Sequence, residues 1–567
     1  MVAVATGAGL SPDRALAAIY NVGLDGAAGG CEANTLEAAV ALAEGTAAND
    51  EIRLESGVLF QPVDTVLLED WNSATQGTLV IRGGYSSCTD TSADGPPAQI
   101  NLLLADPGIR IRNWGPGETV VTLQNVELFG SSGIALEVER HAVVDLLGVV
   151  IAFNEGAGLY VTVGADVYLD AASIVQHSGL IEGDGGIVCV NTGTVVESHA
   201  WVHHNFSSID GGGIHAVGCE VVLGSAALVE DNEAAGNGGG IWATSQSIVS
   251  LFQGARVRDN EAAGYGGGIA ASGSETTVLL MGARITGNRS SSGGGGVFAT
   301  EDAFVGAGGA SCGAAFCPTL LEGNQLVAGA RNGSAAMAAD GAIVQLRQTE
   351  VIGNAVPEAE AFGSVFYAGS GGELRTESVK AFGNLGANRV FQVAGGGSLR
   401  VAFTTAARNR YLDGAGQPAE AFGLWATGTG TEARIFSSIF HPTAGYFADG
   451  SVTSQIDCVI TQTTFGLPAG ATETYVVDPG YLALATGDLR VATASPAVDF
   501  CDTFVFVPTL GALDGRPRGY DSAANAQGLP GPGGASAVQD VGAYELWAIF
   551  TDAFESGSTS AWGDAVP

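Results

Sequence analysis

The sequence predicts an all-β fold, a single-stranded right-handed parallel β-helix (a solenoid), from three observations. A unit of about 28 residues recurs through the middle of the chain, in VEDNEAAGNGGGIWA, VRDNEAAGYGGGIAA and ITGNRSSSGGGGVFA. A fixed period in this range is typical of architectures whose units stack on their neighbours. Between these motifs apolar residues alternate with period two, which indicates strands. The 86 glycines gather at one phase of the repeat, as turn glycines do.

Three short strands per repeat account for the alternation. Strands that pair with their equivalents one turn later are parallel, and parallel crossovers are right-handed. We expect like residues to stack on like in two inward columns, Val196, Leu223, Leu251 and Leu279 in one and Val202, Val229, Val257 and Ile285 in the other.

An asparagine recurs near the end of most units. We expect it to adopt the left-handed conformation of a sharp bend and to bond through its amide to the bends above and below. His177 is assigned to the same position in one unit, and Asn409 to the last. The predicted structural ladder consists of Asn154, Asn205, Asn232, Asn260, Asn288, Asn324, Asn354 and Asn384.

The chain is expected to divide into four segments. An open β-helix exposes unpaired strand edges, so its ends need covers. Asn34 to Glu37, followed by AAVALAEG, predicts a capped amphipathic helix, and Asp50 to Leu54 the first strand. The segments are an N-terminal segment with the capping helix (1–50), the parallel β-helix (51–500), an irregular C-terminal closing segment (501–548) and a short secretion- or anchor-like tail (549–567).

The charge of the chain restricts its partners. Acidic residues outnumber basic ones 59 to 22, which gives a net charge of −37. Such a surface repels phosphates, so a nucleic-acid partner is excluded. No apolar stretch has the length of a membrane span.

The eight cysteines occur as neighbouring pairs, and Cys189 and Cys219 are about one repeat apart. We predict four disulfides and therefore an oxidising compartment. Eight reduced, buried thiols are the alternative. The expected pairs are Cys31 with Cys88, Cys189 with Cys219, Cys312 with Cys317 and Cys458 with Cys501.

The repeats DNEAAGNGGGI and DNEAAGYGGGI resemble those of bacterial right-handed parallel β-helix proteins, including surface adhesins with GGGI and Asn signatures. The tail FTDAFESGSTSAW is similar to the ends of secreted proteobacterial proteins, with Ala553 where glycine is usual. Five C-terminal motifs run in the order of the family called choice-of-anchor Q: Asp478-Pro-Gly, Gly487-Asp-Leu-Arg490, Ala494-Ser-Pro-Ala-Val-Asp499, Leu513-Asp-Gly-Arg-Pro-Arg518 and Asp540-Val-Gly-Ala-Tyr-Glu545.

This resemblance covers roughly residues 25–545. It implies the fold, and it implies export to the medium or to the outer cell surface of a Gram-negative bacterium. It implies no particular reaction, because fold does not fix function.

Two groups of residues are candidates for a site. Asp184, Asp210 and His215 could serve in catalysis, since paired carboxylates and histidine support acid–base chemistry. A polar turn surface is the favoured alternative. An outward stripe of aromatic and basic residues suits an anionic sugar or a partner protein, although a solvated face with local ion pairs is the simpler interpretation. The stripe contains Trp201, His203, Arg256, Arg258 and Arg284.

These observations favour an exported cell-surface or secreted protein that acts without catalysis, as an adhesin-like or structural binding rod. Its expected partner is a glycan or a surface protein, with no resident metal or cofactor. The alternative is a carbohydrate-active enzyme, a polysaccharide lyase or glycoside hydrolase, acting on an acidic polysaccharide. A lyase would use calcium and a hydrolase clustered outward carboxylates, and no dense cluster of that kind is expected on the strand faces.

Overall fold

A computed structural model of the chain forms two compact units, Met1–Leu228 and Val229–Pro567, and each is described by itself. Asp184, Cys501, most of the predicted closing segment and all of the predicted tail lie outside the described part. The described residues are 18–23, 30–46, 49–69, 77–103, 105–115, 117–179, 185–192, 194–313, 315–327, 329–357, 362–468, 471–492, 495–498, 500, 512–515 and 542–544.

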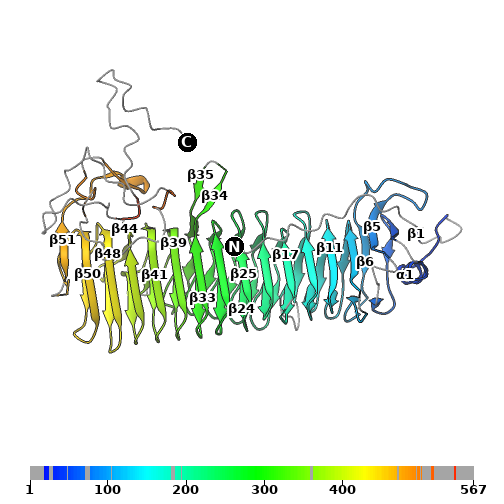
Figure 1. Cartoon of the computed structure of the whole chain (residues 1–567), viewed down its shortest axis with the longest axis horizontal. Helices are drawn as coiled ribbons and strands as arrows, with labels where there is room; N and C mark the ends of the chain where they lie inside the picture. Colours follow the sequence, from blue (N-terminus) through cyan, green and yellow to red (C-terminus); the bar gives the residue numbers. More distant parts are fainter. Residues whose placement is uncertain are drawn as a thin grey trace, which may run out of the picture. The chain divides into compact units, whose positions relative to one another are not determined.

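The first unit consists of three stacks of parallel strands, in which each strand pairs with its equivalent in the next coil (Figure 1). Stack 1 contains β1 (Ala18–Val22), β2 (Asp50–Glu55), β5 (Leu79–Tyr85), β8 (Thr119–Gln124), β11 (Ala142–Leu147), β14 (Asp166–Leu169), β17 (Val195–Ser198) and β21 (Glu220–Leu223). Stack 2 contains β3 (Leu59–Phe60), β6 (Ala98–Asn101), β9 (Val126–Phe129), β12 (Val150–Asn154), β15 (Ile174–Ser178) and β18 (Trp201–His203), followed by the short β19 (Phe206–Ser207). Stack 3 contains β4 (Val66–Glu69), β7 (Ile109–Arg112), β10 (Leu136–Glu139), β13 (Leu159–Thr162), β16 (Ile187–Val190) and β20 (Ile214–Val217).

The predicted capping helix is present as α1 (Leu36–Glu44). The Thr35 hydroxyl caps it by accepting a bond from the Ala38 amide at 3.2 Å. Its apolar face packs on β1, β2 and β4. The expectation that Asp50 begins the first strand was wrong, because β1 precedes the helix and pairs in parallel with β2. Within the described residues, no helix has the length and apolarity needed to cross a membrane.

The second unit has the same three stacks. Stack 1 contains β25 (Ile248–Leu251), β29 (Thr277–Met281), β33 (Phe304–Gly308), β39 (Ile343–Ile352), β41 (Glu373–Phe382), β43 (Ser398–Ala402), β48 (Glu432–Phe440), β50 (Thr453–Thr461) and β51 (Thr472–Val476). Stack 2 contains β26 (Arg256–Arg258), β30 (Arg284–Thr286), β36 (Thr319–Glu322), the second halves of β39 and β41, β44 (Thr405–Ala407), and the second halves of β48, β50 and β51. Stack 3 contains β24 (Ile241–Thr244), β28 (Ile269–Ser272), β32 (Val297–Thr300), β38 (Ala336–Ala338), β40 (Ser364–Ala368), β42 (Arg389–Ala394), β47 (Phe422–Thr427) and β49 (Tyr446–Ala448).

Shorter elements complete the second unit, and β22 (Leu228–Glu230) contains the boundary between the units. A fourth, two-residue strand pairs in parallel through β23 (Glu233–Ala234), β27 (Glu261–Ala262), β31 (Arg289–Ser290) and β37 (Gln325–Leu326). Three antiparallel pairs join β34 (Ala310–Cys312) to β35 (Ala315–Cys317), β45 (Arg410–Leu412) to β46 (Pro418–Glu420), and β52 (Tyr481–Ala483) to β53 (Asp488–Val491), the last through η2 (Leu484–Thr486).

Two short described pieces of the C-terminal segment contact the side of the second unit. The Gln348 side chain donates to the Ala512 carbonyl at 3.0 Å, and the Ala543 amide donates to the Thr405 hydroxyl at 2.9 Å. The Gly542 amide bonds to the Ser437 carbonyl at 2.9 Å. These bonds lie along β39, β44 and β48.

The cores of both units are built from inward columns of aliphatic residues. In the second unit one column is almost fully excluded from solvent and consists of Val249, Val278, Val305, Val344, Leu374, Leu399 and Ala433. The predicted alignment of Val257 with Ile285 is confirmed.

The other predicted column is wrong in register. Leu251 pairs with Leu280, so that Leu279 faces outward, and Val196 pairs with Val221 instead of Leu223. The turn before Thr277 is one residue longer than the turn in the preceding coil, and the segment between Leu280 and Arg284 is one residue shorter than the equivalent segment between Leu251 and Arg256. The two changes cancel, so they leave the repeat length unchanged.

A stack of asparagine side chains runs along the bends after stack 2 of the second unit. Each side-chain amide oxygen accepts bonds from the backbone and side chain of the preceding asparagine, at 2.7 to 3.3 Å, and most of the side chains also donate to a backbone carbonyl in the preceding coil. The stack contains Asn232, Asn260, Asn288, Asn324, Asn354, Asn384 and Asn409. In the first unit Asn154 and Asn205 accept from the Ser131 and Ser178 amides in the same way.

Two details of the predicted ladder need correction. The left-handed residue is the one before each asparagine, such as Asp259 with φ 54° or Gly287 with φ 68°. His177, with φ 48°, holds this preceding position, and Ser178 pairs with Asn154. The bend therefore needs the asparagine for hydrogen bonding and its neighbour for the backbone turn.

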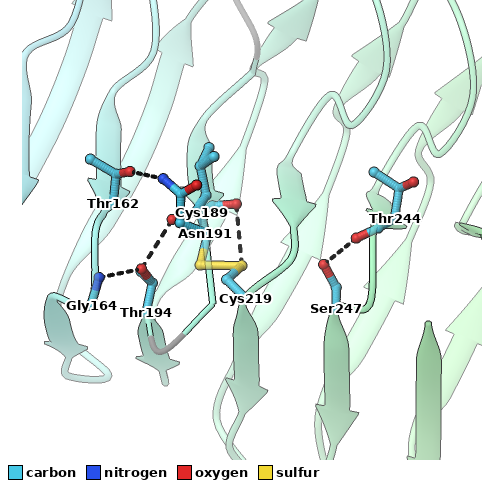
Figure 2. Close-up of a disulfide and its surroundings, with 9 residues drawn as sticks. Thr162, Gly164, Cys189, Asn191, Thr194, Cys219, Thr244 and Ser247 are labelled. Atoms are coloured by element: carbon cyan, nitrogen blue, oxygen red, sulfur yellow. Dashed lines mark hydrogen bonds between the residues drawn. A yellow bond between two sulfur atoms is a disulfide. The ribbon is translucent and has the colours of Figure 1, made fainter. Parts of the chain in front are cut away.

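Three of the predicted disulfides are present: Cys31–Cys88, Cys189–Cys219 and Cys312–Cys317. Cys189–Cys219 joins two neighbouring coils of the first unit (Figure 2). Beside it the Asn191 amide donates to the Thr162 hydroxyl at 2.6 Å, and the Gly164 amide donates to the Thr194 hydroxyl at 2.9 Å. Cys458 is also disulfide-bonded, whereas Cys501, its predicted partner, lies outside the described residues.

Asn288→Ala should destabilise the second unit by about 3 kcal/mol, because the buried donors and acceptors of Asn260, Asn324 and the Val257 carbonyl would lose partners. Urea unfolding followed by far-UV circular dichroism measures the loss. The exposed Arg284→Ala, on the adjacent strand, should change the free energy of unfolding by less than about 0.5 kcal/mol. Equal effects of the two substitutions would contradict a stabilising role for the stack.

Candidate functional site

Of the predicted catalytic residues, Asp210 and His215 lie close together in the first unit, and Asp184 lies outside the described residues. Asp210 sits in the turn before β20, where its carbonyl accepts a bond from the Ser207 hydroxyl at 2.8 Å. His215 lies on the outer face of β20, in register with Val188. Gly211 packs against the backbone of His215, so a side chain at this glycine would collide with the strand. The turn glycine therefore holds Asp210 close to the start of this strand.

The predicted stripe separates into two parts. In the first unit, Trp201 is 39% exposed and stacks on His203 with ring centres 3.9 Å apart. In the second unit, Arg256 and Arg284 are exposed and pair across adjacent strands. Arg258 donates to the buried carboxylate of Glu230, so its charge is neutralised.

Three histidines gather beside Trp201. The Nδ1 atoms of His203 and His204 are 2.6 Å apart, and the ring of His177 lies 5.2 Å from that of His204. Phe153 stacks on the other side of His177 at 4.9 Å. His203 was expected to face solvent, but it is only 6% exposed because Trp201 covers it. Burial and the neighbouring His204 lower the pKa of His177.

Contrary to expectation, carboxylates gather on the outer face of stack 1 in the first unit. Asp145, Tyr168 and Glu197 align on successive coils. A second column on the same face contains Asp166 and, two coils later, Glu220. Burial raises the pKa of Asp166, and the negative charges of Glu118 and Glu220 raise it further. Burial also raises the pKa of Asp145.

His199 joins this acidic cluster. Its Nε2 atom lies 3.5 Å from Glu197 Oε1, and its ring contacts Tyr168. Carboxyl groups with raised pKa values beside ionised ones are the arrangement that acid–base catalysis requires. This cluster could not be predicted from the sequence, because turns of unequal length separate the strands that carry its residues.

One group of potential metal-ligand side chains occurs among the described residues: Cys31, Glu55 and Cys88. The two sulfur atoms form a disulfide and therefore carry no thiolate. The group is a structural crosslink.

An outer column on stack 3 of the second unit was not predicted from the sequence. Its first half is mostly buried, since Tyr265, from the glycine-rich turn, stacks over Phe298 at 4.5 Å. In its second half, Trp425 is half-buried, Phe447 is 37% exposed, and their rings stack 4.2 Å apart. In register order the outer column contains Trp242, Ala270, Phe298, Met337, Tyr367, Gln392, Trp425 and Phe447.

Arg389 lies against the second half of this column. Its guanidinium carbon is 4.4 Å from the centre of the Trp425 ring and 5.7 Å from that of Phe362. One Nη atom donates to the Phe362 carbonyl at 3.2 Å, while the buried Nε atom has no hydrogen-bond partner among the described residues. Arg389 is only 7% exposed, and this burial lowers its pKa.

Residues 108–311 match a family model described as a right-handed beta helix region. The match begins just before β7 and ends within β34, and it covers less than half of the chain. With the parallel pairing of the strands, it identifies the fold as a right-handed parallel β-helix. No curated protein matches the chain.

The histidine cluster predicts a pH-dependent stability of the first unit. Because the pKa of His177 is lowered in the folded state, the unfolded chain binds more protons between the two pKa values. The free energy of unfolding of the first unit therefore decreases as the pH falls through the ordinary pKa of histidine. The melting temperature should fall between pH 7.5 and pH 5, and His177→Gln should reduce that fall.

Calorimetry at both pH values measures the effect. His141→Gln is the matched control, because His141 also has a positive φ but is exposed. A fall in melting temperature that His177→Gln leaves unchanged would show that the cluster does not respond to protons.

Proposed function

We propose that the chain is an exported, non-enzymatic binding protein of the cell surface or the medium, adhesin-like or structural, whose partner is a glycan or a surface protein. The observation that carries this proposal is the second half of the outer column, where aromatic rings from successive coils face outward in register beside Arg389. Aligned aromatic rings with a polar group among them suit a partner that extends along several coils.

Two further features support export. Three disulfides connect described residues, and disulfides persist in oxidising compartments outside the cytosol. The net charge of −37 favours a dispersed, soluble chain and disfavours adhesion to nucleic acid or anionic membranes. The resemblance to exported β-helix proteins agrees with both.

A carbohydrate-active enzyme is the second candidate, and the acidic cluster on stack 1 favours it. Asp145 and Glu197 are two coils apart in one column, so their Cα atoms are separated by roughly 10 Å. Inverting hydrolases place a carboxylic acid and a carboxylate with room for a water between them. The raised pKa of Asp145 suits the acid.

Applied to a glycan array and to a panel of acidic polysaccharides, the full chain should bind a subset of glycans. It should release neither reducing sugar nor unsaturated product, with or without calcium. Product release that disappears in Asp145→Asn or Asp166→Asn, and persists in Asp210→Asn, would instead establish the enzyme and assign its catalytic surface.

A further inference from the structure

Three of the seven histidines of the chain lie together at one bend of the first unit. His203 and His204 are consecutive residues, and His177 holds the position of His204 one coil earlier. The closest contact joins His203 and His204, whose Nδ1 atoms are 2.6 Å apart while their rings are nearly perpendicular, at 81°. Two converging imidazole nitrogens are a candidate ligand pair, because histidine is the commonest metal ligand in proteins.

The fold holds both rings in place. Asn205 follows His204, and its side chain accepts from the Ser178 amide and donates to the Val175 carbonyl, each at 3.0 Å. These bonds fix the bend at which His204 has its left-handed conformation, with φ 52°. The His203 ring is held on its other side by the stacked ring of Trp201. The two nitrogens therefore meet without any help from a bound ion.

The distance between the nitrogens discriminates among metal ions. Within the pair one Nδ1 donates its proton to the other, and a metal ion would take the place of that proton. At metal–nitrogen distances of about 2.0 Å, adjacent ligands are about 2.8 Å apart in a square-planar arrangement and about 3.3 Å apart in a tetrahedral one. The observed 2.6 Å is nearer to the square-planar value, which Cu²⁺ prefers. Cu²⁺ therefore fits with a small rotation of the side chains, whereas tetrahedral Zn²⁺ requires a larger one.

An ion can reach this pair from solvent. His203 is only 6% exposed, but His204 is an exposed residue, so the ion enters from the side of His204. Water is available on that side for the coordination positions that the two side chains do not fill. The net charge of −37 also raises the concentration of cations around the chain.

We propose that His203 and His204 form a binding site for Cu²⁺, with one Nδ1 ligand from each residue and water in the remaining positions. The bound ion exchanges with solvent, unlike a resident catalytic metal. This site goes beyond the proposed binding function and does not depend on it, because neither a glycan nor a surface protein takes part.

Trp201 provides a local readout of the ion. Bound Cu²⁺ quenches indole fluorescence over short distances, and the Trp201 ring stacks on a ligand with ring centres 3.9 Å apart. The full chain, freed of metal with EDTA and dialysed, should lose part of its emission when CuCl₂ is added, since it contains seven tryptophans. Trp201→Phe keeps a stacked ring, so it should remove most of this loss and leave the calorimetric affinity for Cu²⁺ unchanged.

His204→Gln tests the ligand itself. It should weaken Cu²⁺ binding at least about tenfold, because even the loss of a group behind a metal ligand has an effect of that size. His199→Gln is the matched control, since His199 lies in the same coil, with its Nε2 atom 3.5 Å from Glu197, and should not contribute. Electron paramagnetic resonance of the equimolar complex should show two nitrogens coupled to copper in the wild-type chain and one in His204→Gln.

Two outcomes would overturn the site. Wild-type affinity in His204→Gln, or an equal loss in His199→Gln, would show that Cu²⁺ binds elsewhere on the acidic surface. Fewer than two coupled nitrogens in the wild-type spectrum would do the same, whether or not His204→Gln folds. Neither result affects the glycan array, which tests the proposed function separately.

Discussion

Hydrogen bonding between successive coils determines almost every other feature of the two units. Each strand pairs with its equivalent one coil later, so residues at one phase form a continuous column. Inward columns must then be apolar along their whole length, as the one from Val249 to Ala433 is. At the bends the strands end and their backbone groups remain buried. There the asparagine stack supplies the missing partners, with Asn288 alone bonding to Asn260, Asn324 and the Val257 carbonyl.

The sequence allowed the fold to be predicted because these requirements repeat. The asparagine positions, the cysteine pairs one coil apart and the alternation of apolar residues all follow from one coil geometry. Register was harder to predict, because compensating changes in turn length leave the period intact. Leu279 shows this: one extra residue before Thr277 and one fewer between Leu280 and Arg284 turn it outward, while Arg256 still pairs with Arg284. The strand Ala18–Val22 was missed because it precedes the helix that was expected to cover the end.

The candidate surfaces were predicted less well, for the same physical reason. Which outward residues share a column depends on the register of each strand, and the register is known only when the length of every turn between the strands is known. Trp201 and His203 are neighbours on one strand, so their proximity followed from the sequence, but the burial of His203 did not. Asp145 and Glu197 are brought into one column by two coils of different length, and no local pattern marks them. The same holds for Gln392 and Trp425, which lie beyond the recognisable repeats.

Comparison of two arginines explains why Arg389 differs from the charged residues around it. Arg258 is half-buried and meets the carboxylate of Glu230 from the preceding coil, so its interactions are complete within the chain. Arg389 instead meets two aromatic rings and one carbonyl. A cation–π contact contributes about 0.5 to 2 kcal/mol, whereas burying an unpaired ion costs several kcal/mol. In a chain with 59 acidic residues, a carboxylate at a neighbouring position would remove this deficit. Among the residues that the structure describes, no carboxylate pairs with Arg389, so within that part of the chain the two rings and the carbonyl are what compensate for its burial.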